Sequence, residues 1–333
     1  MSTIALFGAT GATGQSIAAA LHSRGLPYRV VGRDADRLKR SFGGDALAEI
    51  MTWDPAQAAS VKAAASGVET LIYLVGVPYD HQELHPVLMT QTLEGAIAAG
   101  VKRILLIGTV YPYGAPTTLT VSEAHPRNPT TFKGRMRKEQ EDILLRAHAQ
   151  GKIEAAILRL PDFYGRDAGE KSFLHLLFKA AVAGGTADMI GPIATPHEFL
   201  YVPDLGPVAL DLAAHPQAYG SGWNFAGAGV TSQRQIAEQV FAMVGRKPKL
   251  RVIGKTALRA LGLLNPFMRE LVEMHYLQTS PVLLDDSALV QLLGQVRKTP
   301  YAEGLRATLE AEWAAARGSV PFPAHGGRAR DPG

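Results

Sequence analysis

Short apolar runs recur through the first half of the chain, and stretches with helical periodicity separate them. The runs occupy residues 4–7, 28–31, 48–53, 70–75, 103–107 and 155–160. The stretches between them predict helices, most clearly at 36–42, 84–99 and 131–149. Continuous apolar strands that alternate with helices are typical of a parallel sheet covered on both faces. The pattern therefore predicts an α/β fold with a doubly wound parallel sheet, in which ligands lie at the carboxyl ends of the strands.

The first apolar run leads directly into a glycine loop with the spacing G-x-x-G-x-x-G, formed by Gly8, Gly11 and Gly14. Gly8 suits a tight turn, Gly11 lets a pyrophosphate approach the backbone, and Gly14 lets helix and strand pack closely. The alternative is an ordinary turn with a capping glycine. Because the loop lies between a strand and a helix, the context favours a dinucleotide site. The other cofactor-binding residues predicted in this loop are Thr10, Ala12 and Thr13.

Arg33 follows the second predicted strand and bears on which dinucleotide is bound. An acidic residue at this position binds the ribose 2′-hydroxyl of NAD, whereas an arginine suits the 2′-phosphate of NADP. Arg33 therefore favours NADP, with Arg37 as a second contact one helical turn later. Because the neighbouring Asp34 is acidic, NAD remains an alternative cofactor. The structural alternative is that Arg33 is a solvated surface residue.

Two later positions are predicted to complete the cofactor site. Asp54 follows the third strand, where it either meets the adenine edge or caps the next helix. Val75 and Gly76 end the fourth strand and are predicted to line a ribose of the cofactor.

The alternation of strands and helices weakens after Pro161. Beyond it the pattern predicts a helix at 172–182, short strands at 199–204 and 223–225, and mainly helices from 232 to 316. We predict a dinucleotide-binding domain made of residues 1–165 and 199–230. Residues 166–198 and 231–320 are predicted to form a smaller, mainly helical substrate lobe. Residues 321–333 are rich in Pro, Gly and Arg and predict a disordered tail.

The composition narrows the function classes. The chain has 333 residues, of which 47% are hydrophobic and 19% charged, as in ordinary globular proteins. The net charge is only +4 and no long basic block occurs, so nothing favours nucleic acid as a partner. The absence of cysteine excludes disulfides and thiolate chemistry and fits a cytoplasmic location. No apolar run approaches the roughly 20 residues of a membrane span, and no signal peptide is expected.

The chain resembles the short-chain dehydrogenase/reductase superfamily, specifically its extended or atypical branch of NAD(P)-dependent epimerase/dehydratase-like proteins. The stretches that carry the resemblance are 8–14, Asp54, 108–114, 133–141, 158–165, 199–204 and 299–306. The resemblance covers nearly the whole chain except the tail, and it is more specific for fold and cofactor than for reaction. It implies a Rossmann fold, an NAD(P) cofactor, a small-molecule substrate and a homodimer.

The catalytic set of this family combines a Ser or Thr after the fifth strand with a Tyr-x-x-x-Lys motif on the next helix. Thr109 matches the first element, and the resemblance implies that its hydroxyl holds a substrate oxygen. The alternative is a threonine that satisfies the backbone of a turn. The second element departs from the family, because Lys133 stands in place of the tyrosine and Arg137 in place of the lysine. Glu141 falls where the family often has a glutamate.

Lys133, Arg137 and Glu141 are four residues apart and therefore share one face of the predicted helix. A neighbouring apolar stripe, suited to the core, consists of Phe132, Met136, Ile143 and Ala147. One interpretation of the charged face is a solvated surface in which Glu141 pairs with the basic residues. The other is a site, similar to that of isoflavone-reductase-like reductases, in which Arg137 binds the nicotinamide ribose. In that site Lys133 contacts the cofactor and transfers a proton.

Four residues near the ends of predicted strands are predicted to face the substrate, namely Tyr111, Tyr113, Asp162 and Tyr164. One of the tyrosines could replace the missing phenol, while the alternative is that they are packing aromatics in rigid loops. His81 and His85 have a metal-like spacing but lack a nearby third ligand, so no metal site is predicted.

The sequence thus predicts an NADP-favouring oxidoreductase that acts on a small carbonyl, sugar-like or aromatic substrate. An epimerase or dehydratase that oxidises its substrate transiently is a variant of this prediction. A non-catalytic NADP-binding redox sensor is the second class, because retained glycines beside a missing Tyr/Lys pair fit it as well. Catalysis requires hydride exchange with a substrate, whereas a sensor requires cofactor-dependent binding of a partner without turnover.

Overall fold

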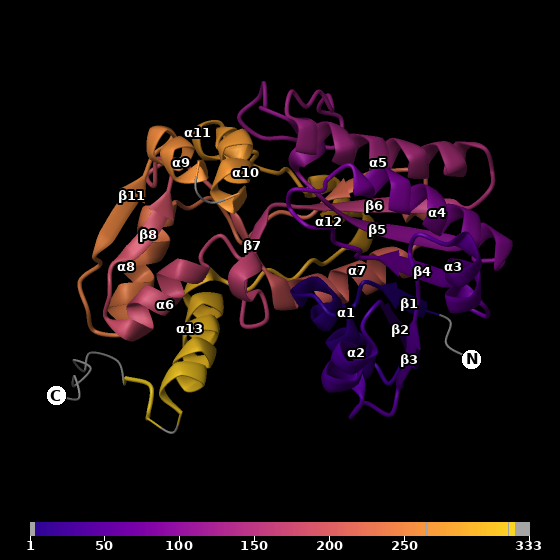
Figure 1. Cartoon of the computed structure of the whole chain (residues 1–333), viewed down its shortest axis with the longest axis horizontal. Helices are drawn as coiled ribbons and strands as arrows, with labels where there is room; N and C mark the ends of the chain where they lie inside the picture. Colours follow the sequence, from indigo (N-terminus) through magenta and orange to yellow (C-terminus); the bar gives the residue numbers. More distant parts are fainter. Residues whose placement is uncertain (1–3, 264–265, 319, 324–333) are drawn as a thin grey trace.

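Seven parallel strands form the central sheet of the computed structural model, which describes residues 4–263, 266–318 and 320–323 (Figure 1). The strands are β1 (Ile4–Phe7), β2 (Tyr28–Gly32), β3 (Ala48–Thr52), β4 (Thr70–Tyr73), β5 (Arg103–Thr109), β6 (Glu154–Leu160) and β10 (Gly222–Asn224). Their order across the sheet is β10-β6-β5-β4-β1-β2-β3. The order reverses between β1 and β4, and ligands bind at such a switch point in open parallel sheets. The predicted doubly wound α/β fold is confirmed.

Helices cover both faces of this sheet. One face carries α1 (Ala12–Ser23), α2 (Ala35–Phe42), α7 (Leu205–Ala214) and α12 (Ser287–Leu293). The other carries α3 (Ala58–Ala65), α4 (Leu84–Ala98) and α5 (Phe132–Ala149). Successive strand residues point to opposite faces, so in β1 Leu6 packs into the first layer, and Ala5 and Phe7 pack into the second. Each strand must present apolar side chains to the helices on both faces, and its apolar run is therefore continuous.

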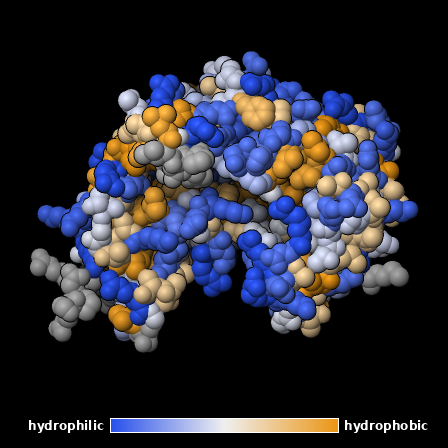
Figure 2. Space-filling model, in the orientation of Figure 1, coloured by the Kyte–Doolittle hydropathy of each residue, from blue (hydrophilic) through white to orange (hydrophobic). Residues whose placement is uncertain are grey.

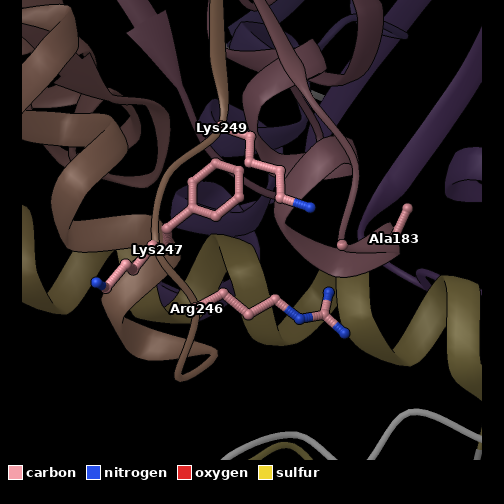
Figure 3. Close-up of a pocket in the computed structure, with 6 residues that line it drawn as sticks. Ala183, Arg246, Lys247 and Lys249 are labelled. Carbon is pink, nitrogen blue, oxygen red and sulfur yellow. The ribbon is translucent and has the colours of Figure 1, made fainter.

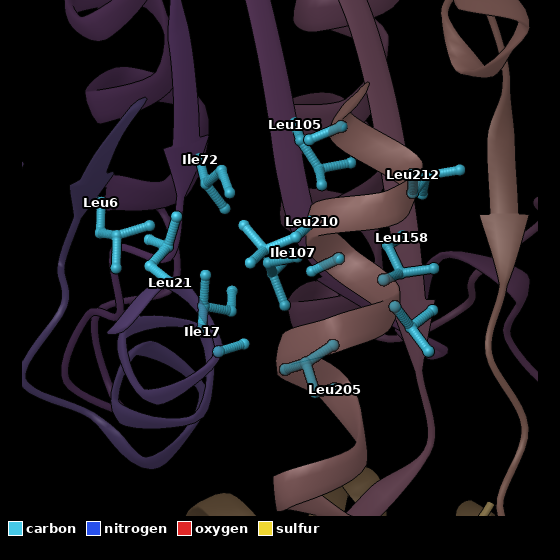
Figure 4. Close-up of a cluster of buried hydrophobic side chains, with 14 of the residues drawn as sticks. Leu6, Ile17, Leu21, Ile72, Leu105, Ile107, Leu158, Leu205, Leu210 and Leu212 are labelled. Atoms are coloured by element: carbon cyan, nitrogen blue, oxygen red, sulfur yellow. The ribbon is translucent and has the colours of Figure 1, made fainter. Parts of the chain in front are cut away.

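The core between the sheet, α1 and α7 is shown in Figure 4. Its labelled side chains are Leu6, Ile17, Leu21, Ile72, Leu105, Ile107, Leu158, Leu205, Leu210 and Leu212, all of them buried. The two helices approach closely at Gly206, where a Cβ atom would lie 2.2 Å from the carbonyl oxygen of Ser16. The Ser16 hydroxyl accepts a hydrogen bond from the Gly206 amide (2.9 Å) and donates one to the Val202 carbonyl (2.7 Å). This contact fixes the start of α7 against α1.

A smaller region packs around its own apolar core, which includes Leu177, Phe241 and Leu309. Its helices are α6 (His175–Ala183), α8 (Gln233–Met243), α9 (Lys255–Gly262), α10 (Pro266–Met274), α11 (Tyr276–Thr279) and α13 (Tyr301–Arg317). Two short parallel pairs accompany them, β8 (Ala187–Ile190) with β11 (Leu250–Ile253) and β7 (Asp162–Tyr164) with β9 (Phe199–Tyr201). Single 3-10 turns lie at Tyr111–Tyr113, Gly169–Lys171, Val202–Asp204 and Pro216–Ala218.

Mainly helices follow residue 232, as predicted, but the sequence did not predict the strands β11 and β8. Both strands have only four residues, and neither is fully buried. They therefore lack the continuous apolar run that identifies a central strand of a parallel sheet.

The surface is hollowed between the sheet with its helices and the region that carries α13 (Figure 2). A cavity of 440 Å³ lies between α1 and α13, with Gln15, Arg166 and Ala307 among its lining residues. The predicted domain boundaries stay a prediction, and residues 324–333 of the predicted tail lie outside the described residues. In the described part of the chain, no helix combines the length and apolar character that crossing a bilayer demands.

Glu198 joins the two regions through a buried carboxylate. It accepts the Leu284 amide at 2.8 Å and the Gly227 amide at 3.3 Å, and its side chain is 4% exposed. Burial raises the pKa of Glu198 to about 7, although the two amides, His197 and Lys298 act in the opposite direction. Folding therefore stabilises the protonated form of Glu198 relative to the ionised form.

We expect Glu198 to make stability fall as the pH rises. The pKa in the folded chain lies above the ordinary value, so its contribution is fully present below about pH 4.5 and is lost as the pH rises through about 7. A shift of this size corresponds to about 3 kcal/mol. Urea unfolding at pH 5 and pH 8 should show a pH dependence that is smaller by about that amount in Glu198→Gln. Equal pH dependence in the two proteins would contradict this assignment.

Candidate functional site

The glycine loop connects β1 to α1, and the tight packing predicted at Gly8 and Gly14 is present. Gly8 has φ +89°, and a Cβ atom there would lie 2.9 Å from the backbone of Leu74. A Cβ atom at Gly14 would lie 2.2 Å from the carbonyl oxygen of Ala9, so helix and strand could not pack. At Gly11, in contrast, a Cβ atom would meet only the ammonium nitrogen of Lys171, at 3.9 Å. Gly11 therefore leaves open space beside the start of α1.

That space belongs to a cavity of 320 Å³ at the switch point of the sheet. The predicted residues that line it are Gly8, Thr10, Gly11, Ala12, Thr13, Arg33, Arg37, Val75 and Gly76. The lining is completed by Gly32, Trp53, Pro55, Leu74, Val77, Pro78, Phe163 and Lys171. Gly11 is the N-cap of α1, and no side chain caps that helix. An uncapped helix N-terminus with its amides and positive dipole end fits a phosphate group.

Two arginines stand at the rim of this cavity near the end of β2. Arg33 and Arg37 are both exposed, and a guanidinium nitrogen of Arg37 donates to the Thr10 carbonyl at 3.4 Å. Asp34 is the N-cap of α2, and its carboxylate accepts the Arg37 amide at 3.0 Å. This hydrogen bond lowers the pKa of Asp34. The Asp34 carboxylate, which was the reason to consider NAD, is thus engaged in capping α2. Arg33 and Arg37, in contrast, both line the cavity.

Asp54 does not line the cavity, although Trp53 and Pro55 on either side of it do. Its exposed carboxylate accepts the Ala56 amide (3.0 Å) and the side-chain amide of Gln57 (2.6 Å). Helix α3 begins only at Ala58, with Gln57 as its N-cap. The prediction that Asp54 caps this helix is therefore wrong, because its carboxylate closes a turn that precedes the helix. Contact with the adenine stays a prediction.

Thr109 is the last residue of β5 and begins the turn that leads to Tyr111. Its hydroxyl oxygen accepts the Tyr111 amide at 3.2 Å. A hydroxyl carries one proton of its own, so Thr109 can still donate to a substrate oxygen. The Thr109 hydroxyl thus makes the turn contact of the structural alternative. Its proton is still available for the predicted contact with a substrate oxygen.

The charged face of α5 is buried, which excludes a solvated basic surface. Lys133 is 1% exposed, Arg137 9% and Glu141 1%. In the predicted apolar stripe, by contrast, Phe132 is 42% exposed and Met136 is half-buried. The assignment of that stripe to the core is wrong at these positions, because the charged residues find partners on other elements and take the inner face.

Lys133 is held by two carboxylates from α10. Its ammonium nitrogen donates to Glu270 at 2.5 Å and to Glu273 at 2.8 Å, and its backbone amide also donates to Glu273 at 3.1 Å. The ring of Tyr79 lies over the ammonium, with 5.0 Å between the nitrogen and the ring centroid. Two opposite charges and a π-face compensate the burial of the lysine charge.

Tyr79 extends this arrangement to other groups, which together form the lysine–tyrosine cluster. Its members are Lys133, Glu270, Glu273, Tyr79, Tyr111, Asp162 and Tyr276. The hydroxyls of Tyr79 and Tyr111 are hydrogen bonded to each other. Burial raises the pKa of Tyr111 to about 12, and the Asp162 charge acts in the same direction. Both phenols therefore remain protonated and can donate hydrogen bonds.

Arg137 turns away from Lys133 toward α4. A guanidinium nitrogen donates to the Gln140 side chain (2.9 Å) and lies 3.1 Å from a ring nitrogen of His85. Burial, followed by the Arg137 charge, lowers the pKa of His85 to about 2, so this histidine is neutral. His81 is exposed instead, and the described residues contain no group of three potential metal ligands.

Glu141 forms a buried ion pair with Arg159 of β6. Two guanidinium nitrogens of Arg159 donate to its carboxylate at 3.0 and 2.8 Å, and Arg127 adds a third bond at 3.0 Å. Burial opposes the charge of Arg159, but the Glu141 carboxylate outweighs it and raises the pKa of the guanidinium. This pair ties α5 to the sheet and belongs to the structure beneath the site.

The four predicted substrate residues fall into two groups. Tyr111 and Asp162 belong to the lysine–tyrosine cluster. Tyr113 is 1% exposed, and its hydroxyl is bonded to Asn224 (2.7 Å) and Arg159 (3.0 Å). Tyr164 is fully buried, and its ring stacks on that of Tyr301 and meets that of Tyr201 at a tilt. The burial of Tyr113 and Tyr164 fits packing, the alternative that the sequence left open.

Sequence reasoning missed the cluster members that come from elsewhere in the chain. Tyr79 follows the cavity residue Pro78, and Glu270 and Glu273 are spaced to share one face of α10. That spacing marks a helix face, but it gives no indication that the face meets residue 133. Lys171 was also missed, since it lies in a short turn without a motif.

A further cavity of 330 Å³ lies in the smaller region (Figure 3). Its lining residues are Ala183, Gly184, Phe241, Arg246, Lys247 and Lys249. Arg246 donates to the Ala181 carbonyl at 2.9 Å and so stabilises the end of α6. In Figure 3 Lys247 points away from the other cationic groups.

Comparisons with known proteins agree with this geometry. The model of the NAD-dependent epimerase/dehydratase family matches residues 4–226. A relative from Kitasatospora kifunensis, dTDP-6-deoxy-L-talose 4-dehydrogenase (NAD(P)(+)), is 26% identical over 65% of this chain and 71% of its own length.

Solved structures with the same fold include a dTDP-glucose 4,6-dehydratase from Streptomyces venezuelae with bound NAD. Its TM-score is 0.77 at 17% identity, over 94% of this chain and 97% of that one. The UDP-glucuronic acid 4-epimerase of Bacillus cereus, also in complex with NAD, has a TM-score of 0.77 at 16% identity, with coverage of 93% and 98%. The fold therefore extends over both regions of the chain. Since the family model matches more than half of the residues, including the glycine loop and the whole central sheet up to β10, the chain belongs to the NAD-dependent epimerase/dehydratase family.

Proposed function

We propose that the chain is an NAD(P)-dependent oxidoreductase, with NADP favoured, that acts on a carbonyl or hydroxyl group of a small or sugar-like substrate. One observation carries the proposal. Pro78 and Phe163 line the cavity at the glycine loop, and their neighbours in the chain, Tyr79 and Asp162, belong to the lysine–tyrosine cluster. A bound dinucleotide would thus have proton-bearing side chains next to its reactive end.

The residues present fit a dinucleotide. Gly11 keeps the space that a pyrophosphate needs, and a Cβ atom there would project into it. Arg33 and Arg37 line the same cavity and would bind a 2′-phosphate, and Val75 and Gly76 would line a ribose. When bound, the nicotinamide supplies hydride transfer, which side chains cannot perform.

The protein supplies orientation and proton transfer. The Thr109 hydroxyl donates to the substrate oxygen and fixes its position at the end of β5. The ammonium group of Lys133 gives that oxygen a proton when a carbonyl is reduced, and takes it back in the reverse direction. Glu270 and Glu273 hold the ammonium in place through two short hydrogen bonds.

A nucleotide-sugar epimerase or dehydratase is the second candidate. It is favoured by two structural relatives, a dTDP-glucose dehydratase and a UDP-sugar epimerase, whereas the dTDP-sugar dehydrogenase fits the first candidate. Such an enzyme regenerates its cofactor within each turnover. Net consumption of NADPH with a carbonyl substrate therefore supports the oxidoreductase, and conversion of a nucleotide sugar without net NADPH change supports the second candidate. Nucleotide-dependent binding of a protein partner, with no turnover in either assay, supports the redox sensor. The homodimer stays a prediction.

We expect Arg33→Ala to weaken NADPH binding about 10- to 100-fold and to leave NADH binding unchanged. Loss of charged hydrogen bonds to a phosphate costs about 1.5–3 kcal/mol, and NADH lacks that phosphate. Calorimetric titration of the purified chain with NADP⁺, NADPH, NAD⁺ and NADH measures both effects. Arg146→Ala, an exposed change on α5 away from the cavity, is the control. An equal loss for NADH and NADPH would contradict the 2′-phosphate assignment.

A further inference from the structure

The turn that follows β7 lies against the start of α1. Ala168 in this turn packs with Ala12, the first residue of α1, and with Val202, all three being at most 7% exposed. Phe163 of β7 packs on the same cluster and also lines the cofactor cavity. The turn therefore has a fixed position over the glycine loop, although it belongs to the part of the chain that leads into the smaller region.

Hydrogen bonds hold the backbone of this turn. The Lys171 amide donates to the Ala168 carbonyl at 3.1 Å. The Ser172 hydroxyl donates to the Phe163 carbonyl at 2.9 Å and accepts the Leu174 amide at 3.2 Å. The Cα atom of Lys171 is thus anchored to β7 on one side and to the start of α6 on the other.

The side chain of Lys171 enters the cofactor cavity. It is one of the lining residues, and its ammonium nitrogen is the atom nearest to the space that a Cβ atom at Gly11 would fill. Among the described residues this ammonium group has no acidic partner within ion-pair distance and no hydrogen-bond acceptor. Lys171 is an exposed residue, and its ammonium nitrogen lies next to the open space beside the uncapped start of α1.

We propose that Lys171 binds the diphosphate of the dinucleotide from the side opposite to α1. A diphosphate carries negative charge on both phosphates, and the helix start compensates it with amides and only a partial charge. A lysine ammonium is a compact point charge that suits a phosphate without requiring a fixed hydrogen-bond geometry. Lys171 thereby couples cofactor binding to the turn between β7 and α6. This assignment rests on the proposed function, since it presumes a dinucleotide in the cavity.

The test separates the diphosphate from the 2′-phosphate. ADP carries only the first and adenosine 2′-monophosphate only the second, and both are titrated calorimetrically into the unmodified chain, Lys171→Met and Arg33→Ala. We expect Lys171→Met to weaken ADP about 10-fold and to leave adenosine 2′-monophosphate unchanged, and Arg33→Ala to show the reverse pattern. NADH and NADPH should weaken by the same factor in Lys171→Met, because they share the diphosphate. The loss should shrink at high salt, since screening weakens the contact.

Two variants serve as controls. Lys179→Met removes an exposed lysine from α6 and should bind ADP like the unmodified chain, whereas Lys171→Arg should retain most of the affinity. Unchanged ADP affinity in Lys171→Met overturns the assignment and leaves the proposed function intact. Failure of the unmodified chain to bind ADP, NADH and NADPH overturns both.

Discussion

Glu141→Ala is expected to lower the free energy of unfolding by about 3–5 kcal/mol, because it leaves Arg159 buried without its partner. Arg159 is 3% exposed and directs its guanidinium group to the Glu141 carboxylate. The charge cannot be neutralised, since an arginine does not lose its proton in proteins. Water must then enter beside β6, or the guanidinium must leave its position; either event costs stability.

Urea unfolding of the purified chain, followed by circular dichroism, measures this loss. Glu139→Ala is the matched control, since it removes an exposed glutamate from the same helix. A double change of Glu141 and Arg159 to leucine removes both charges and should recover part of the stability. A loss below 1 kcal/mol in Glu141→Ala would show that the ion pair does not hold α5 to the sheet.

Lys133→Met is expected to reduce turnover about 100- to 10,000-fold, the usual contribution of a positioned proton donor. The dissociation constant for NADPH should stay within a factor of three, because Lys133 does not line the cofactor cavity. Turnover is followed as oxidation of NADPH with a carbonyl substrate that the unmodified chain reduces. Loss of the ammonium group also leaves Glu270 and Glu273 without their partner, which can itself disturb the structure.

Lys133→Arg resolves that concern. The guanidinium group keeps the positive charge and can bond both carboxylates, but its pKa is too high for it to transfer a proton near neutral pH. Low turnover in Lys133→Arg with unchanged thermal stability supports proton transfer by Lys133. Turnover restored to that of the unmodified chain would show that Lys133 only positions α10, and the proton would then have to come from another group such as Tyr111.

The glycine loop and the central sheet could be predicted because their signals are local. Gly8, Gly11 and Gly14 form a recognisable spacing within one strand, one loop and one helix. The apolar runs identified the strands since both faces of the sheet are covered. The charged face of α5 could also be recognised, and its spacing was sufficient to bring Lys133 and Glu141 to one side.

The partners of that face could not be predicted, since they come from distant segments. Glu270 and Glu273 lie 137 and 140 residues after Lys133. The position of Lys171 over Gly11 likewise depends on how the turn after β7 packs on α1. Periodicity alone assigned Phe132 to the core and left open whether the charged face is solvated or forms a site. Tertiary ion pairs bury the charged face and leave Phe132 exposed, which no local pattern could indicate.

The position of β10 has a consequence for synthesis of the chain. This strand pairs with β6 in the register Gly222 to Ile157, yet it begins 62 residues after β6 ends at Leu160. At about 5–20 residues per second, a ribosome needs about 3–12 s to make that interval. During this time the outer edge of β6 has no partner strand, and an unpaired edge invites association with other chains. β10 can pair with β6 only after α6 and α7, which precede it in the chain, have been made.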